Sequence, residues 1–290
     1  MGRLTRTRPV VKVRADADGR VVRRSDTLAV EEPLEVRLDG SAFLVTMRTP
    51  GDDVDLVHGL LHGEGVITTA SDVVLARYCA GTDADGLQTY NVLDVSLVPG
   101  AAPTGPLRQV LVNSACGLCG STSIDQVVTA RRHPTTWREP LPVERVLEAP
   151  ERLREQQRAF DKTGGLHAAG LVDADGELVC VREDVGRHNA LDKVIGWALR
   201  EGRLPLVGCT LVVSSRASYE LTQKAVLAGA ELLVAVSAPT SLAVELADEA
   251  GLTLVAFVRG DSMNVYTHPE RLDLAAVGSA VPAGAGVPVG

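Results

Sequence analysis

The chain has 290 residues, of which 45% are hydrophobic and only 3% aromatic, and its formal net charge at neutral pH is −8. A chain of this length can bury a substantial core, and a core poor in aromatic residues favours valine-, leucine- and alanine-rich sheets packed against helices. No apolar run is long enough to cross a membrane and no signal peptide is apparent, so we expect a cytoplasmic protein. Five cysteines, an odd number, argue against a disulfide framework.

The charge is distributed unevenly along the chain. Residues 1–24 contain eight Arg or Lys and two Asp, a net charge of +6, so the remainder carries −8 − 6 = −14. A basic segment of this kind could contact a nucleic acid or an acidic partner. We instead expect residues 1–25 to form a flexible, solvated arm, and we expect neither a nucleic acid nor a membrane among the partners.

The region after this arm, residues 26–105, is predicted to be a smaller β-rich N-terminal extension. Strands at 34–38 and 42–47 are joined by Asp39-Gly40, a dipeptide favoured in two-residue hairpin turns. A helix is predicted over 52–62, before Gly63. Further strands are predicted at residues 73–78 and 90–98, and beyond this region a short strand at 107–112 leads to the cysteine loop.

The rest of the folded chain, residues 106–274, is predicted to be an α/β domain. A helix interrupted near Pro150 is expected over residues 143–160. Short, continuous, Val- and Leu-rich strands follow later in the chain, at residues 208–214, 232–237 and 252–258. Helices separate these strands, which predicts a mostly parallel sheet buried on both faces. The tail, residues 275–290, is expected to be disordered.

Three loops follow these strands, at the carboxyl edge where such sheets bind ligands. They contain Ser214, Ser215 and Arg216, then Ser237 and Thr240, then Val258, Arg259, Gly260, Asp261 and Ser262. Hydroxyl groups, backbone N–H groups at helix starts and two guanidinium groups suit a phosphate. The alternative is that the hydroxyl residues only cap the helices that follow. We favour an anionic ligand, because all three loops share one edge.

Polar residues also gather at the start of the helix predicted over residues 187–201. Arg187, His188, Asp192 and Lys193 have helical spacings and can converge on one face, although an exposed charged helix has the same composition. His167 is either a catalytic base or a core histidine. Two further cysteines, Cys180 and Cys209, alternate with apolar strand residues and are expected to be inert.

The segment Cys116-Gly117-Leu118-Cys119-Gly120 carries the most informative chemistry. Two thiols two residues apart, each followed by glycine, indicate a reactive and accessible loop. Residues 123–126 fit a helix-capping pattern, and a helix start would favour the thiolate form of the cysteines. A thiolate is both a nucleophile and a metal ligand. The alternative is a pair of structural cysteines or an incidental disulfide.

Two other chemistries use this spacing. His62 and Glu64, with Cys116 and Cys119, are similar to the zinc-deaminase signature, although Ala115 stands where that signature has proline. The C-x-x-C spacing is also that of thiol–disulfide exchange, but no thioredoxin-like βαβ start surrounds it.

At these residues the chain resembles the FdhD family, the sulfur-carrier proteins required for active formate dehydrogenase. The resemblance covers residues 31–272 approximately. It rests on the cysteine loop at residues 116–120, Thr-Gly-Gly-Leu-His-Ala-Ala at 163–169, the polar motif at 182–193, Ser-Ser-Arg at 214–216, Ser-Ala-Pro-Thr-Ser at 237–241 and Val-Tyr-Thr-His-Pro at 265–269.

The resemblance implies a three-layer cytidine-deaminase-like α/β domain, usually paired as a homodimer. It implies that a cysteine desulfurase passes sulfur to the loop as a persulfide. The acceptor would be the bis-molybdopterin guanine dinucleotide cofactor of formate dehydrogenase. A chaperone that shelters this cofactor without transferring sulfur, and a zinc-dependent deaminase-like hydrolase, are the alternatives.

We therefore expect Cys116 to carry the persulfide and Cys119 to assist as a relay thiol or second acceptor. No resident metal and no tightly bound cofactor are expected. The guanine nucleotide of the acceptor is expected to contact Phe257, Val258, Arg259, Gly260, Asp261, Ser262, Ser214, Ser215, Arg216, Arg187, His188, Lys193, Ser237 and Thr240.

Overall fold

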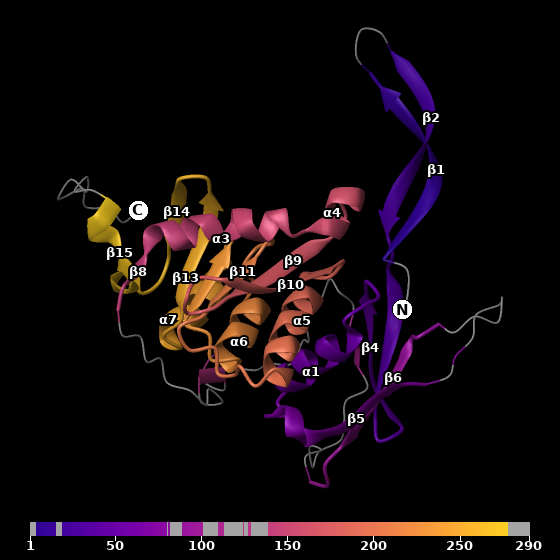
Figure 1. Ribbon diagram of the computed structural model, residues 1–290, viewed down its shortest axis with the longest axis horizontal. Coiled ribbons are helices and arrows are strands. Elements are labelled where there is room, and N and C mark those ends of the chain that lie inside the picture. The colour runs from indigo at the N-terminus through magenta and orange to yellow at the C-terminus, as the bar shows by residue number, and fades with distance from the viewer. Residues whose placement is uncertain are drawn as a thin grey trace.

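The computed structural model describes residues 4–15, 19–79, 81, 89–100, 110–112, 124, 127–128 and 139–277 (Figure 1). The N-terminal elements are β1 (Thr5–Arg14), β2 (Arg20–Ala29), β3 (Glu32–Leu38), β4 (Ser41–Arg48), α1 (Asp53–Gly63), η1 (Ala70–Asp72), β5 (Val73–Tyr78), β6 (Val92–Leu97) and β7 (Val110–Val112). The later elements are β8 (Leu141–Pro142), α3 (Val143–Glu155), α4 (Arg158–Thr163), β9 (His167–Val172), β10 (Leu178–Asp184), α5 (Arg187–Arg200), β11 (Thr210–Val213), α6 (Tyr219–Leu227), β12 (Leu232–Ala235), α7 (Ser241–Glu249), β13 (Thr253–Arg259), β14 (Ser262–Val265), η2 (Pro269–Arg271), β15 (Leu272–Asp273) and η3 (Leu274–Val277).

The β-rich N-terminal region forms a five-stranded sheet in the order β5-β6-β3-β4-β7. The predicted hairpin is confirmed, because β3 and β4 pair in antiparallel register around Asp39 and Gly40, whose φ angles of 48° and 81° suit the two-residue turn. Helix α1 packs on this sheet through buried Leu56, Val57 and Leu61. The packing gives the N-terminal region a hydrophobic core of its own.

The larger sheet has six strands in the order β10-β9-β11-β12-β13-β14. The three Val- and Leu-rich strands β11, β12 and β13 pair in parallel, as their sequence predicted. The outer strands β9, β10 and β14 all pair antiparallel to their neighbours. Two of the five pairings are parallel and three are antiparallel, so the description of the sheet as mostly parallel is not confirmed. Two hairpins, β9–β10 and β13–β14, add antiparallel strands at its flanks.

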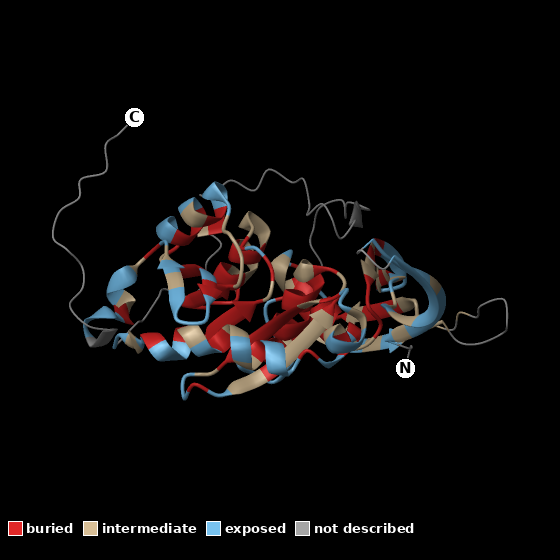
Figure 2. Cartoon of the chain, turned by 90° about the horizontal axis from the view of Figure 1, so that it is seen from above, coloured by how far each residue is buried: buried red, intermediate tan, exposed pale blue. Residues whose placement is uncertain are grey.

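Helices cover both faces of this sheet (Figure 1). Along β11, Leu211 and Val213 join the core shared with α5, α6 and α7, whereas Val212 joins the core under α3. Figure 2 shows the buried strands between helices whose outer surfaces are exposed. This alternation explains why β11 is apolar throughout, since a strand buried on both faces has no side that tolerates polar residues.

The helical segment after β8 breaks at a different place from the one predicted. Pro150 lies inside α3, and the interruption comes at Gln156 and Gln157 instead. The carboxylate of Glu183, on β10, accepts hydrogen bonds from the backbone N–H groups of Ala159 (2.8 Å) and Phe160 (2.7 Å). A carboxylate from another element thus starts α4 by satisfying its free N–H groups.

The basic arm is a β-ribbon and not an unstructured segment. Strands β1 and β2 pair over their whole length, from Thr5 opposite Ala29 to Arg14 opposite Arg20. The ribbon projects from the body near α4 (Figure 1). At the other end of the chain, η3 occupies residues 274–277, and residues 278–290 of the expected disordered tail lie outside the described residues.

The two halves of the molecule meet where α1 crosses α5. Gly59 of α1 and Gly196 of α5 lie at the crossing. A Cβ atom at Gly59 would overlap the carbonyl oxygen of Asp192, and one at Gly196 would overlap that of Asp55. The two helix backbones are therefore in contact, and only glycine fits at either position.

We expect Gly59→Ala to lower the free energy of unfolding by about 3 kcal/mol, because the added methyl group would force two helix backbones apart. Chemical denaturation measures this loss. The matched control is Gly63→Ala in the same helix. There the new Cβ atom would meet the Lys224 side chain, whose ammonium nitrogen lies 3.2 Å away, and not a helix backbone. A Gly59→Ala protein as stable as the wild type would contradict the close crossing.

Candidate functional site

The two cysteines of the loop, Cys116 and Cys119, lie outside the described residues, but the chain on each side of them is placed. Before them, β7 pairs in parallel with β4 in the five-stranded sheet. After them, Val127 is buried in the core shared by α5 and α6. The cysteine segment thus connects the N-terminal sheet to the C-terminal core.

A cavity of about 540 Å³ opens at the carboxyl edge of the parallel strands. Its lining includes Gly164, Gly165, His167, Ser214, Arg259 and Gly260, together with residues of α3 and Phe160 of α4. Of the predicted ligand-binding residues, Ser214, Val258, Arg259 and Gly260 therefore meet at one cavity. The fold brings His167 to the same place, because β9 runs antiparallel to β11 and so begins at this edge.

Most of the hydroxyl groups predicted to bind phosphate already have partners in the protein. The Ser214 hydroxyl accepts a hydrogen bond from the Ala168 backbone N–H at 2.9 Å. The Thr240 side chain caps α7 by accepting one from the Ala243 N–H at 3.3 Å. The hydroxyls of Ser215 and Ser262 donate to the backbone carbonyls of Arg216 and Arg259. Ser237 contributes its carbonyl, which accepts from the Phe257 N–H at 3.3 Å.

The arginines at this edge are free to bind a ligand. Arg216 and Arg259 are exposed, and neither forms an ion pair with any residue in the described part of the chain. Asp261 is exposed in the turn between β13 and β14. The positive charge that the sequence predicted at this edge is thus carried by the guanidinium groups, while the hydroxyl groups serve the fold.

Phe257 is held in an unusual backbone conformation two residues before Arg259. Its φ angle is 54°, in the left-handed region that a bulky residue rarely adopts. The pairing of β13 with β14 is irregular between Ala256 and Arg259, and the ring remains 39% exposed. A strained, exposed aromatic residue two positions before the unpaired Arg259 is the kind of feature found at ligand sites.

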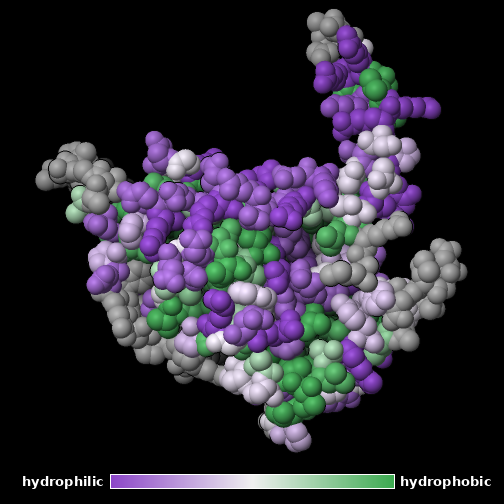
Figure 3. All heavy atoms as spheres, viewed as in Figure 1, coloured by the Kyte–Doolittle hydropathy of each residue, from purple (hydrophilic) through white to green (hydrophobic). Residues whose placement is uncertain are grey.

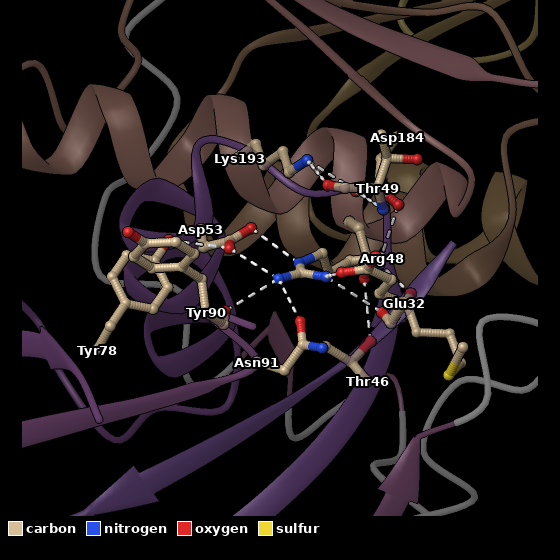
Figure 4. A network of polar contacts seen from close by, with 12 residues as sticks. Glu32, Thr46, Arg48, Thr49, Asp53, Tyr78, Tyr90, Asn91, Asp184 and Lys193 are labelled. Carbon is tan, nitrogen blue, oxygen red and sulfur yellow. Dashed lines mark hydrogen bonds and ion pairs between the residues drawn. The ribbon is translucent and has the colours of Figure 1, made fainter. Parts of the chain in front are cut away.

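Lys193 does not join this site. It is 1% exposed, and its ammonium group contacts the Asp184 carboxylate at 2.8 Å and the Thr49 carbonyl at 2.9 Å (Figure 4). The Asp184 carboxylate also accepts from the Thr49 backbone N–H and from the amide of Asn189. The polar motif therefore ties α5 and β10 to the end of β4, and Lys193 has no donor available for an anionic ligand at the sheet edge.

The same junction contains a second buried cation, which sequence reasoning missed. The Arg48 guanidinium, 1% exposed, contacts the Asp53 carboxylate through two hydrogen bonds of 3.1 Å and also donates to the carbonyl of Tyr90 and the amide oxygen of Asn91 (Figure 4). Burial and the Asp53 carboxylate, to which the Tyr78 hydroxyl donates at 2.9 Å, raise the pKa of Tyr78. The sequence did not predict this role, because a single arginine at the end of a strand belongs to no recognisable motif.

Arg187 and His188 lie at the start of α5. His188 contacts the carboxylate of Glu220 at 2.6 Å, and this hydrogen bond lowers the pKa of Glu220. The Nε of Arg187 is buried and has no partner among the described residues. An unsatisfied charged donor of this kind is costly unless a ligand or an ordered water completes it.

The pKa of His167 is lowered, first by burial and then by the positive charges of Arg187 and His188. The imidazole is therefore neutral at neutral pH, when it can accept a proton. Burial also raises the pKa of the Cys180 thiol to about 12 and that of Cys209, which makes both thiols poor nucleophiles. The expectation that these two cysteines are unreactive agrees with this environment.

Comparisons with known proteins agree on one family. The model of the FdhD/NarQ family matches residues 29–273. A protein of Nocardia farcinica called sulfur carrier protein FdhD is 55% identical over 280 residues, which is 96% of this chain and 98% of the relative. A protein of the same name from Mycobacterium tuberculosis is 50% identical over 278 residues, 94% of this chain and 100% of the relative.

A solved structure has the same fold. The putative formate dehydrogenase accessory protein from Desulfotalea psychrophila superposes with a TM-score of 0.72 at 23% identity, covering 93% of this chain and 100% of that one. Kinship of the α/β domain with the cytidine deaminases stays a prediction. Among the helices that the structure describes, none has both the length and the apolar character needed to cross a bilayer.

We expect Arg187→Gln to raise the pKa of His167, because the substitution removes a positive charge that opposes protonation of the ring. Titration of the histidine ring protons by NMR measures the change. Arg158→Gln, an exposed position on α4, is the control and should leave the titration unaltered. A His167 pKa that is the same in the Arg187→Gln protein and the wild type would show that Arg187 does not act on this ring.

Proposed function

The chain belongs to the FdhD/NarQ family, and from this premise we propose that it is a sulfur carrier in the maturation of formate dehydrogenase. It would take sulfane sulfur from a cysteine desulfurase as a persulfide and deliver it to the bis-molybdopterin guanine dinucleotide cofactor, its substrate. The observation that carries the proposal is the Cys-Gly-Leu-Cys-Gly segment within a family match of residues 29–273. We also propose, on the family resemblance, a homodimer in the cytoplasm.

Cys116 and Cys119 are the best candidates for the sulfur-bearing groups. Flanking glycines leave their backbone unhindered, and a helix after them would stabilise a thiolate. Cys180 and Cys209 have thiols whose pKa burial raises, so they are protonated at neutral pH. Only a thiolate attacks sulfur efficiently, which supports assigning the transfer to the loop.

The transfer is an exchange at sulfur. The Cys116 thiolate attacks the outer sulfur of the desulfurase persulfide, a new S–S bond forms, and the desulfurase cysteine leaves as a thiolate. The persulfide now on Cys116 then presents its outer sulfur to the acceptor. Cys119 would assist in one of two ways. Its thiolate attacks the inner sulfur, so that a Cys116–Cys119 disulfide forms and the outer sulfur leaves as sulfide for the acceptor, or it attacks the outer sulfur and takes it over as its own persulfide while Cys116 leaves as a thiolate.

The cavity at the sheet edge suits one nucleotide part of the acceptor. Its volume of about 540 Å³ falls within the usual range of small-molecule sites. Arg259, on β13, lines it, and Arg216 is exposed beyond the end of β11, which is separated from β13 by β12. The buried Nε of Arg187 offers a further unused donor, and the exposed ring of Phe257 offers a surface on which a base can stack.

We expect Cys116→Ala to abolish sulfur loading, because Cys116 is the proposed first acceptor and burial keeps the thiols of Cys180 and Cys209 protonated at neutral pH. Intact-mass spectrometry after incubation with a cysteine desulfurase and cysteine should show the wild type heavier by one sulfur atom, lost on reduction. Cys209→Ala is the matched control and should load normally.

The same measurement separates sulfur transfer from a chaperone role. A chaperone would bind the cofactor but gain no mass from the desulfurase. Full loading of the Cys116→Ala protein would remove Cys116 from the reaction, and an unloaded wild type would contradict the sulfur-carrier proposal itself.

We expect Arg259→Ala to weaken binding of guanosine diphosphate about tenfold, the effect of losing one charge-assisted phosphate contact. Isothermal titration calorimetry measures the affinity. The control is Arg158→Ala, which removes an exposed arginine that does not line the cavity. An Arg259→Ala protein with wild-type affinity would place the nucleotide elsewhere.

A further inference from the structure

The N-terminal ribbon of β1 and β2 has a surface that the sulfur-carrier proposal does not use. Each strand has ten residues, so the ribbon is about 33 Å long. It projects from the body, and its base lies against α4, where a Cβ atom at Gly165 would come within 3.8 Å of that of Ala29 (Figure 1). Isolated two-stranded ribbons are only marginally stable in water, so a partner that covered one face would stabilise this one.

The register of the two strands separates the charged side chains by face. Successive side chains of a strand point to opposite faces, and residues paired across the two strands share a face. One face, called here the basic face, therefore carries six exposed basic residues: Arg6, Arg8, Lys12, Arg14, Arg20 and Arg24. The opposite face has a single basic residue, Arg23. The ribbon is thus cationic on one side.

Most cations of the basic face have no anionic partner within the part of the chain that the structure describes. Only Arg24 of the six forms an ion pair there, with Asp26 on the same face at 3.2 Å. Six positive charges and one negative charge give this face a net charge of +5. At the base the other face turns to the body, since Ala29 belongs to it. The basic face is therefore open to a partner of negative charge.

Aliphatic side chains on the basic face indicate that this partner is a protein. Val10, Val22 and Leu28 lie among the cations, and the last two are 51% and 43% exposed. Figure 3 shows hydrophobic side chains among the hydrophilic ones of the ribbon. Protein interfaces combine arginine with apolar contacts, whereas single-stranded nucleic acids are bound by aromatic stacking. Neither strand of the ribbon contains an aromatic residue.

The charge of the rest of the chain supports the same choice of partner. The chain beyond residue 24 carries −14, against +6 for residues 1–24. A nucleic acid is charged along its whole length, so the body would repel the part of it that extends beyond the ribbon. A protein can carry its acidic residues in one bounded patch, which reaches the projecting ribbon without approaching the body.

The base of the ribbon adjoins the cavity at the sheet edge. Gly165 lines that cavity and lies beside Ala29 of the ribbon. A protein bound along the ribbon would therefore lie next to the site from which, under the proposed function, the cofactor is delivered. We propose that the basic face docks on a carboxylate-rich surface of the enzyme that receives the cofactor. This inference rests on the sulfur-carrier function proposed above.

The test compares two charge reversals on opposite faces of the ribbon. Lys12→Glu alters the basic face, whereas Arg23→Glu, in the next cross-strand pair, makes the same change of charge on the other face. Biolayer interferometry at about 0.15 M salt, where charges are screened beyond about 8 Å, measures binding of the full chain to formate dehydrogenase purified without its cofactor. Lys12→Glu should raise Kd about fivefold and Arg23→Glu less than about twofold, while Lys12→Arg, which keeps the charge, should leave Kd unchanged.

Four results would overturn the proposal. Equal weakening by Lys12→Glu and Arg23→Glu would show that net charge matters and the face does not. A wild type that does not bind the enzyme, or a Lys12→Glu protein that binds it as well as the wild type does, would contradict the docking directly. A short DNA duplex at the same salt should not bind, and binding of the duplex that Lys12→Glu abolishes would assign the ribbon to nucleic acid.

Sulfur loading of the wild type separates this inference from the function on which it rests. A wild type that takes up sulfur but does not bind the enzyme through its ribbon contradicts only the docking. A wild type that takes up no sulfur contradicts the sulfur-carrier proposal, whatever the binding measurement shows.

Discussion

The contact between α1 and α5 is the constraint on which the rest of the structure depends. Gly59 and Gly196 let two helix backbones touch, so the five-stranded sheet is fixed against the six-stranded one. The cysteine segment has one flank in each half, since β7 belongs to the first sheet and Val127 to the core of the second. A change in the crossing would therefore move one flank of the loop relative to the other.

Buried charges reinforce the same junction and explain a motif that looks like a binding site. Lys193 and Asp184 form a pair with almost no exposure, and the pair also binds both backbone groups of Thr49. A buried ion pair of this kind adds little net stability. Removing one partner is nevertheless strongly destabilising, because the other partner would remain as an uncompensated buried charge. Arg187 lies at the start of the same helix with an unused buried donor, and it is the residue of this motif that we propose for ligand binding.

Local patterns in the sequence predicted local structure well. The Asp39-Gly40 turn and the parallel order of β11, β12 and β13 follow from turn chemistry and from apolar runs buried on both faces. Features set by distant partners could not be predicted. The Glu183 carboxylate on β10 caps the start of α4, and the Asp184 carboxylate on β10 forms an ion pair with Lys193 of α5. The ribbon was missed because most of its residues are exposed on both faces, so it lacks the buried apolar face whose period identifies a strand.

The structure thus places a nucleotide-sized cavity with unpaired arginines in the same α/β domain whose core anchors the end of the dithiol segment. The central claim is that sulfur passes through this protein to the cofactor. A chase with ³⁵S-labelled cysteine, desulfurase and purified cofactor tests it most directly. The label should appear first on the wild-type protein and then on the cofactor, with no transfer when Cys116 and Cys119 are both replaced by alanine. Labelled cofactor formed at the normal rate by that double variant would contradict the claim.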